Sequence, residues 1–262
     1  MPEPLAESTR PDAKVHSAKN ESRLYGVNAC LAAFEKRPQD VRKVYLTETR
    51  IAAFKPVLAW CVQHRLGYRV VETADLDRLT GSRHHEGVCF DVRRRDTLTL
   101  DEFLDAQADQ RMPSLLLWFD GVGNPHNFGA VLRSAAHFAA AGVLIAADST
   151  LDATGAAARV AEGGAESLAI VRAVQTRATV ERLQHAGYMI AATVPRDGAS
   201  LYATTLPARL AFVLGAESAG MHTALVERAD VRLTIPGSGA VESLNVAASA
   251  SLLLGEYWRQ HR

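Results

Sequence analysis

An asparagine and an arginine stand at a fixed spacing in the stretch NPHNFGAVLRSA near the middle of the chain. Asn127 and Arg133 lie six residues apart in what reads as one helix, directly after the apolar run SLLLWFDGVG. Asn is a good residue for the start of a helix, because its side chain accepts a hydrogen bond from a free backbone N–H. The stretch holds more such polar residues than a turn needs, which indicates a functional site where this helix begins.

Two further loops resemble this one in character, and all three follow apolar runs with the length of buried strands. They read DGVGNPHNFG, GAESAGM and IPGSGAVESLN. In an open parallel sheet, ligands bind beyond the carboxyl ends of the strands. The polar residues of these loops are therefore expected to gather at one edge; beside Asn127 and Arg133 they include Glu217, Ser243 and Asn245.

Several common chemistries lack their motifs. A dinucleotide fingerprint fails at its third glycine, and a phosphate-binding loop ending in Gly-Lys-Ser/Thr is absent. There is no Gly-x-Ser-x-Gly elbow for a hydrolase. Glycine loops with backbone groups and a carboxylate suit a flat, heteroaromatic, positively charged cofactor better than a multiply charged phosphate.

The elements that must position these loops alternate between strand and helix from Ser114 onward, which predicts a parallel sheet covered on both faces. A smaller α/β unit is expected over residues 21–95, after a flexible tail at 1–20. Its expected helices are GVNACLAAFEK and FKPVLAWCVQHRL, and its expected strands are VRKVYLT, GYRVVET and GVCFDV. Residues 96–112 are polar and charged, with a short helical stretch at LDEFLDAQ, and are assigned to a linker. The second domain is assigned to residues 113–262.

Charge is divided unevenly along a chain whose formal net charge is zero. Residues 1–95 hold 17 Lys and Arg against 12 Asp and Glu, and the rest of the chain holds 12 against 17. A basic N-terminal part suits a polyanion such as RNA, but a solvated surface of mixed sign explains it equally well. No apolar run is long enough to span a membrane, and no secretory signal is evident, so a cytoplasmic protein is expected.

Metal and redox roles are not expected. Cys30, Cys61 and Cys89 are far apart and odd in number, which favours reduced structural thiols. His84 and His85 are adjacent, and adjacent side chains on a strand point to opposite faces, so the pair is poorly placed to hold one ion. A solvated loop is predicted there.

The three loops resemble, in order and spacing, motifs one, two and three of the SpoU (TrmH-type) RNA ribose 2′-O-methyltransferases. The resemblance covers roughly Ser114 to Arg259. The segment from SRLYGVNACLAAF to HEGVCFDV resembles the small substrate-binding domain of many members, which is similar to ribosomal protein L30e. Motif one commonly begins Asp-Pro, whereas this chain has Asn124-Pro125, and Gly237 stands where motif three often has Met or Leu.

The resemblance implies S-adenosylmethionine as methyl donor, a C-terminal trefoil knot in the α/β domain, a homodimer and structured RNA as substrate, ribosomal RNA being favoured over transfer RNA. No metal is implied. Asn127 and Arg133 match the catalytic positions. The positions that match the cofactor pocket are Leu214, Gly215, Glu217, Ile235, Pro236, Ser243, Leu244 and Asn245.

Each assigned role has a structural alternative. Asn127 could be only a helix N-cap, Arg133 a surface arginine, Ile235 and Leu244 plain core residues, and Glu217 a solvated turn carboxylate. Arg133 is an awkward base because guanidinium keeps its proton, so it is expected either to share the task with an RNA phosphate or only to anchor that phosphate. Arg23, Arg83 and residues 93–95 are weak candidates for RNA contacts. Two rivals are a catalytically inactive RNA-binding protein of the same fold and a Rossmann-like enzyme with a nicotinamide cofactor.

Overall fold

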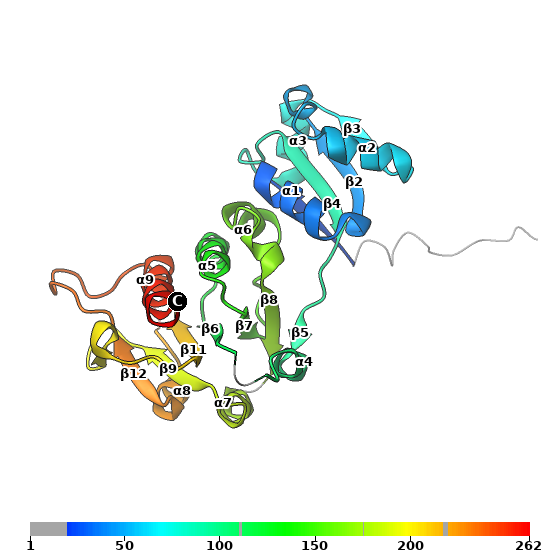
Figure 1. Cartoon of the computed structure of the whole chain (residues 1–262). Coiled ribbons are helices and arrows are strands. Elements are labelled where there is room, and N and C mark those ends of the chain that lie inside the picture. The colour runs from blue at the N-terminus through cyan, green and yellow to red at the C-terminus, as the bar shows by residue number, and fades with distance from the viewer. Residues whose placement is uncertain (1–19, 110–111, 175, 217–219) are drawn as a thin grey trace, which may run out of the picture.

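A computed structural model of the chain describes residues 20–109, 112–174, 176–216 and 220–262. Two α/β domains follow one another along the chain, the smaller N-terminal domain lying over helices α5 and α6 of the larger one (Figure 1). Among the described residues, no helix combines the length and the apolar character needed to cross a membrane. The same residues contain no group of three or more His, Cys, Asp or Glu side chains that could hold a metal ion.

The N-terminal domain is a four-stranded sheet in the order β1-β4-β2-β3, in which β4 is antiparallel to both β1 and β2 and only β2 and β3 run parallel. Its core is apolar and includes Phe54 and Phe90, whose rings meet edge to face. The predicted elements are present, and β1 and α3 are additional. Their bounds are β1 Glu21–Tyr25, α1 Val27–Lys36, β2 Val41–Leu46, α2 Lys55–Gln63, β3 Gly67–Val70, α3 Thr73–Thr80 and β4 Val88–Arg93.

The C-terminal domain is an eight-stranded sheet in the order β10-β12-β9-β11-β6-β7-β8-β5, and every pairing in it is parallel. This confirms the predicted parallel α/β architecture. The strands are β5 Leu98–Thr99, β6 Ser114–Asp120, β7 Gly142–Ala146, β8 Ala169–Ala173, β9 Met189–Thr193, β10 Ala199–Ser200, β11 Arg209–Gly215 and β12 Val231–Thr234. The helices are α4 Leu100–Ala106, α5 Pro125–His137, α6 Gly155–Val160, α7 Thr176–His185, α8 Thr223–Arg228 and α9 Val246–His261.

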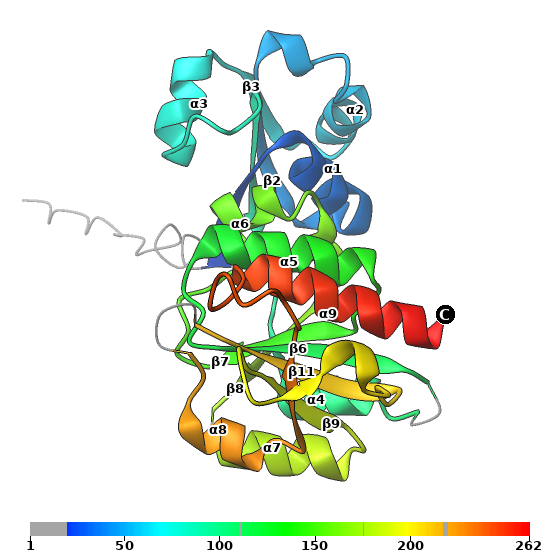
Figure 2. The same ribbon diagram turned by 90° about the vertical axis from the view of Figure 1, so that its left-hand side faces the viewer.

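Helices cover both faces of this sheet, because its central strands are apolar on both sides. Odd positions of β6, such as Leu117, pack with α5, α6 and α9, whereas even positions, such as Trp118, pack with α4, α7 and α8. Figure 2 shows α5 and α9 side by side on the face that carries the N-terminal domain. The path of the chain through a knot is not settled by strand order, and the knot stays a prediction.

The segment assigned to a linker, residues 96–112, is largely built into the second domain. Strand β5 pairs with β8 at the sheet edge. Helix α4 begins with a capping box between Thr99 and Glu102 and buries Leu100 and Phe103 against the sheet. Polar composition suggested a linker here, but two well-spaced apolar residues are enough to anchor so short a helix.

The segment His84–Glu86 was predicted as a solvated loop, and this is wrong for two of its residues. His85 is buried; its Nδ1 accepts a hydrogen bond from the Gly87 N–H at 3.0 Å, and its Nε2 lies 3.2 Å from an Asp77 carboxylate oxygen. Glu86 accepts a hydrogen bond from the Val27 N–H at 2.8 Å, at the start of α1. The loop is therefore a structural connection inside the N-terminal domain, held by polar contacts that composition alone does not reveal.

The three cysteines are buried and carry free thiols in the structure. Burial raises the pKa of the Cys89 thiol to about 12 and keeps it protonated.

Candidate active site at the carboxyl edge of the sheet

The ends of four neighbouring strands form the site edge. Strands β12, β9, β11 and β6 are adjacent in the sheet, and Gly215 at the end of β11 pairs in register with Asp120 at the end of β6. The three loops singled out in the sequence leave three of these strand ends. We call this region the carboxyl edge and define it as residues 120–127, 214–216 and 235–245.

Asn124, rather than Asn127, caps helix α5. The Asn124 Oδ1 accepts hydrogen bonds from the N–H groups of His126 at 2.8 Å and Asn127 at 3.4 Å. Pro125 occupies the first helical turn, where its missing N–H is tolerated. Asn124 stands where motif one commonly has Asp, and either residue can cap a helix. Asn127 therefore does not act as the cap.

Asn127 is left to join two motifs that lie more than a hundred residues apart. Its Oδ1 accepts a hydrogen bond from the Nδ2 of Asn245 at 3.2 Å. Asn245 is at the same time the N-cap of α9, where its Oδ1 accepts from the Ala247 N–H at 2.9 Å. This amide–amide contact links the starts of α5 and α9 at the site edge.

Arg133 does not take part in that contact. Six residues along an α-helix correspond to about 9 Å of rise and about 120° of rotation, so Arg133 projects from a different side of α5 than Asn127. Its side chain is exposed and makes no ion pair or hydrogen bond with the rest of the described chain. Its guanidinium is therefore available to a molecule outside this chain.

The residues matched to a cofactor pocket differ in their exposure. Leu214 is buried and Gly215 and Ile235 are half-buried, and Ile235 packs against the main core. The rest of motif three is exposed, including Leu244 at 45%. Figure 1 shows the loop between β12 and α9, which contains these residues, extending away from the sheet. The exposed set is Pro236, Ser243, Leu244 and Asn245. Glu217 lies outside the described residues.

The carboxyl edge has open volume beside these residues. A side-chain Cβ built at Gly123, Gly237 or Gly239 would meet no atom within 4 Å. By contrast, a Cβ at Gly215 would lie 2.7 Å from the Gly220 backbone, because the chain folds back on itself in the antiparallel bridge of Ala216 with Gly220. Gly215 is therefore required by the local backbone, whereas the other glycines border free space.

Sequence reasoning missed a contact between motifs one and two. Asp120 accepts a hydrogen bond from the His222 backbone N–H at 2.6 Å, and its other carboxylate oxygen lies 2.7 Å from the His222 Nδ1. The Asp120 side chain is only 11% exposed. A carboxylate that ends a buried strand, directly before a glycine, was the available signal. This contact holds the second loop against the end of β6.

The sequence of residues 114–255 matches the SpoU rRNA Methylase family, and residues 23–98 match a domain described as RNA 2′-O ribose methyltransferase substrate binding. The chain belongs to the SpoU rRNA methylase family. This confirms the resemblance seen in the three motifs, and with it the predicted class of enzyme, an RNA methyltransferase.

Individual relatives cover most of both domains. The chain is 35% identical to an uncharacterized tRNA/rRNA methyltransferase, YfiF, of Escherichia coli O157:H7, over 96% of this chain and 72% of the relative. It is 33% identical to the 23S rRNA (guanosine-2′-O-)-methyltransferase RlmB of Nitrosomonas europaea, over 91% of each. The crystal structure of the SpoU methyltransferase AviRb from Streptomyces viridochromogenes with AdoMet has the same fold, with a TM-score of 0.76 at 24% identity, over 95% of this chain and 94% of that one.

Proposed function

We propose that the chain transfers a methyl group from S-adenosylmethionine to a ribose 2′-hydroxyl of ribosomal RNA. The observation that carries the proposal is the Asn127–Asn245 contact, which joins motifs one and three at the carboxyl edge on the helix that presents an exposed Arg133. Relatives named 23S rRNA (guanosine-2′-O-)-methyltransferase, at 29–33% identity, support ribosomal RNA as the substrate.

The carboxyl edge fits this cofactor. A Cβ at Gly123, Gly237 or Gly239 would meet no atom within 4 Å, which leaves room for a ligand, and the apolar side chains of Ile235 and Leu244, on the same loop as Gly237 and Gly239, suit the faces of an adenine ring. Backbone groups of the loops can pair with the ring edge and the ribose. S-adenosylmethionine supplies a methyl group on a sulfonium, which is already activated for transfer. The cofactor-binding residues in this proposal are Leu214, Gly215, Glu217, Ile235, Pro236, Ser243, Leu244 and Asn245.

The protein's own residues then have to orient the ribose. We assign to Arg133 the binding of an RNA phosphate next to the target nucleotide, since a guanidinium offers a planar fork of donors and keeps its proton at neutral pH. Asn127 sets the position of α5 against motif three and faces the reacting groups. The hydroxyl proton leaves to that phosphate or to water. Alignment of this kind supplies on the order of 7–11 kcal/mol in well-oriented intramolecular reactions.

The active unit in this proposal is a homodimer. A groove of about 260 Å³ between the C-terminal ends of α5 and α9 is lined by apolar side chains, among them Phe138 and Trp258, together with the polar side chains of His261 and Arg262. Met112 in its lining is 62% exposed. A second copy of the chain would cover these side chains. Light scattering on the purified protein tests this, and a mass of one chain at micromolar concentration would contradict it. We also place the protein in the cytoplasm, because the relatives named above are bacterial ribosomal RNA methyltransferases.

The rival with the same fold, an inactive RNA-binding protein, is disfavoured because Asn127 and Arg133 are both present and Arg133 has no structural partner in the described chain. Transfer RNA is the alternative substrate, since YfiF carries both RNAs in its name. Both questions are decided by one transfer assay in which ribosomal and transfer RNA are offered separately.

The test replaces Arg133 with Ala and measures two quantities. We expect methyl transfer to RNA to fall by a factor of 100 or more, roughly the loss seen when a group that stabilises a transition state is removed, while calorimetry still detects binding of S-adenosylmethionine. His137→Ala, an exposed substitution one turn further along α5, is the matched control and should leave both unchanged. Turnover of Arg133→Ala close to wild type removes Arg133 from the mechanism. A wild type that binds no cofactor refutes the proposed function itself.

A further inference from the structure

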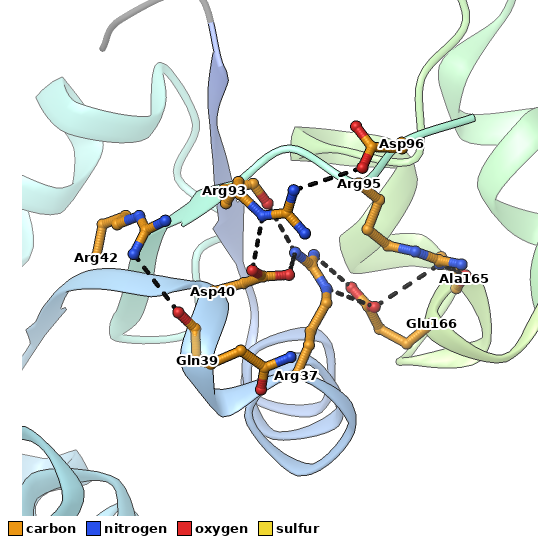
Figure 3. Close-up of polar contacts among 9 residues, drawn as sticks. All are labelled: Arg37, Gln39, Asp40, Arg42, Arg93, Arg95, Asp96, Ala165 and Glu166. Carbon is orange, nitrogen blue, oxygen red and sulfur yellow. Dashed lines mark hydrogen bonds and ion pairs between the residues drawn. The ribbon is translucent and has the colours of Figure 1, made fainter.

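A buried ion cluster lies between the two domains and has no part in the chemistry proposed above (Figure 3). Arg37, just after α1, donates from Nε and Nη2 to the two carboxylate oxygens of Glu166, both at 2.9 Å. Arg37 is 9% exposed and the Glu166 side chain 6%. The first residue belongs to the N-terminal domain and the second to the C-terminal domain, so a two-pronged, water-shielded pair crosses the boundary.

The remaining donors of this cluster are also used. Arg37 donates from Nη1 to the Arg93 carbonyl oxygen at 2.7 Å and lies 3.4 Å from Asp40, which Arg93 contacts at 2.8 Å. Burial opposes the charge on Arg37, but Glu166 and Asp40 raise its pKa, so it stays a cation. Arg37 therefore has acceptors on both sides of the boundary: Glu166 in the C-terminal domain, and Asp40 and the Arg93 carbonyl in the N-terminal domain.

Arg95 adds a second link across the boundary. It donates to the backbone carbonyl of Ala165 at 2.5 Å and to that of Leu168 at 2.9 Å. Arg94 pairs with Asp152 at 2.8 Å. The arginines at 93–95 thus make contacts within the chain, as does Arg23, which pairs with Asp91 at 2.8 Å. Of the weak RNA-contact candidates, only the exposed Arg83 is left without such a partner in the described chain.

Apolar and amide contacts continue the interface along α1. The Asn28 Nδ2 donates to a Glu162 carboxylate oxygen at 2.6 Å, and Arg159 lies 3.4 Å from Glu86. Ala158, at the middle of α6, is buried within the hydrophobic core of the N-terminal domain. A residue of one domain is thus part of the core of the other.

Two consecutive glycines, Gly163 and Gly164, pack between the N-terminal domain and α5, the helix that holds Arg133. Gly163 has φ of +86°, and a Cβ there would lie 2.7 Å from the Ala32 Cβ on α1. A Cβ at Gly164 would lie 3.0 Å from the Ala136 Cβ and 3.3 Å from the Arg133 Cα on α5. The turn after α6 therefore fits between α1 and α5 with backbone contact on both sides, which only glycine allows.

We propose that Arg37 and Glu166 are positioning residues that lock the N-terminal domain onto helix α5. The domain and Arg133 then form one rigid unit, a ruler, whose fixed length selects which ribose of the bound RNA is methylated. This rests on the proposed function. Domains joined by a short connection move relative to each other by default. A buried ion pair adds little net stability compared with apolar packing, and fixing a unique arrangement is its best-attested use. Here the arrangement fixed is the distance from the N-terminal domain, whose sequence matches a substrate-binding domain, to Arg133.

The lock can be measured without RNA. Labels attached to Val62→Cys in the N-terminal domain and Tyr202→Cys in the C-terminal domain, both exposed positions, report the distance between the domains. The native cysteines are buried and will not compete for the label. We expect one narrow distance distribution for the otherwise native protein and a broad one for Glu166→Ala. Arg42→Ala is the matched control, because exposed Arg42 reaches, within the described part of the chain, only the Gln39 carbonyl, at 3.5 Å (Figure 3).

The selection of the target ribose is tested by methyl-transfer kinetics and by mapping the methylated nucleotide. If the released domain spends about a tenth of its time in the locked orientation, KM for the RNA rises about tenfold. In Glu166→Ala, kcat at saturating RNA should change much less, and riboses near the normal target should become methylated. The isosteric Glu166→Gln should show the same changes to a smaller degree. A structural defect alone would lower the active fraction without spreading the sites.

Gly163→Val provides an independent opening of the interface, because it inserts a side chain against Ala32 and leaves every charge in place. A folded Glu166→Ala or Gly163→Val variant with wild-type KM, a single methylated site and a narrow distance distribution overturns the proposal. So does a broad distribution in the native protein. Should the native protein show a narrow distribution but methylate no RNA, the proposed function fails and the ruler with it, and the lock is then known to serve something else.

Discussion

Two regions of this protein combine glycines with polar side chains, and they use them in opposite ways. At the interface between the domains, Arg37, Glu166 and Arg95 are paired within the chain, and Gly163 touches Ala32 where any side chain would clash. At the carboxyl edge, residues 236–245 are exposed and their glycines border open space. The same residue types close one region and leave the other open.

The difference shows which polar residues belong to structure and which to function. A buried polar group that lacks a partner is costly, so evolution of a stable interface leaves few of them. Arg93 to Arg95 drew attention in the sequence as a basic run, yet the structure uses all three internally. Arg133 carries the same charge and has no partner in the described chain. The partners of an arginine within the chain, rather than its charge, therefore distinguish a structural role from a functional one.

The largest effect that tests this comparison is on stability. Arg37→Ala removes the two-pronged partner of buried Glu166 and leaves it the longer contact with Arg95, at 3.7 Å. Removal of one partner of a buried pair costs about 3–5 kcal/mol. Arg133→Ala removes an exposed side chain and should change the free energy of unfolding by less than about 0.5 kcal/mol. Urea denaturation of the two variants measures both values. Equal losses in the two variants would show that the interface and the edge do not differ in this way.

Two glycines of the C-terminal domain allow the same contrast without charges. A Cβ at Gly129 on α5 would lie 2.5 Å from the Ala157 carbonyl oxygen on α6, whereas one at Gly237 in motif three meets nothing. We expect Gly129→Ala to lose about 1–3 kcal/mol through overpacking. Gly237→Ala should keep wild-type stability or gain up to about 1 kcal/mol. Thermal melting compares them, and a stable Gly129→Ala would mean that α5 and α6 can move apart freely.

Much of the fold could be predicted from the sequence, because its strands and helices carry strong local patterns. SLLLWFD is continuously apolar and forms the buried strand β6, and the apolar stripe of Phe128, Val131, Leu132 and Ala135 is the buried face of α5. Strand β10 and helix α8, which are only two and six residues long, were missed, as were strand β1 and helix α3. Residues 98–106 were assigned to a linker because their few apolar residues carry less weight than their charges, although those few anchor them to the sheet.

The candidate site could be predicted in its parts but not in its connections. The motifs identify Asn127 and Asn245 separately, and only the fold brings their amides to 3.2 Å. Likewise, nothing local in the sequence pairs Asp120 with His222 or Arg37 with Glu166, because such pairs depend on long-range packing. The capping role was assigned to Asn127, and the structure gives it to Asn124, three residues earlier, since the helix already begins at Pro125.

A smaller effect is expected at that cap. Asn124→Ala removes the side chain that accepts from His126 and Asn127, and loss of such a cap costs about 1 kcal/mol. Asn124→Asp, which restores the residue common in motif one, keeps the acceptor and adds a negative charge at the positive end of the helix, so it should be neutral or slightly stabilising. Thermal melting of the pair is the measurement. If Asp destabilises as much as Ala, the side chain acts through something other than capping.

The smallest effect concerns a charged cluster confined to one helix, which lies between the two extremes compared above. Glu256 on α9 accepts hydrogen bonds from Arg259 at 2.6 and 2.8 Å and from Gln260 at 2.7 Å, and these hold its pKa at about 2, below the ordinary 4.5. A carboxyl with a lowered pKa in the folded state contributes stability that is complete above pH 4.5 and is lost as the pH falls toward 2. The contribution is modest because the Arg259 side chain is 67% exposed and water screens the pair.

Glu256→Gln keeps the shape of the side chain and cannot ionise. We therefore expect it to lower the melting temperature slightly at pH 7 and to flatten the decline of the melting temperature between pH 4.5 and pH 2. Added salt should reduce the difference from wild type at pH 7, as it does for exposed pairs, and should leave the difference caused by Arg37→Ala largely intact. An unchanged acid limb in Glu256→Gln would mean that other carboxylates, such as Asp40 beside Arg93, dominate acid unfolding; the pKa of Asp40 is also lowered, by Arg93 and Arg37 against the opposing effect of burial.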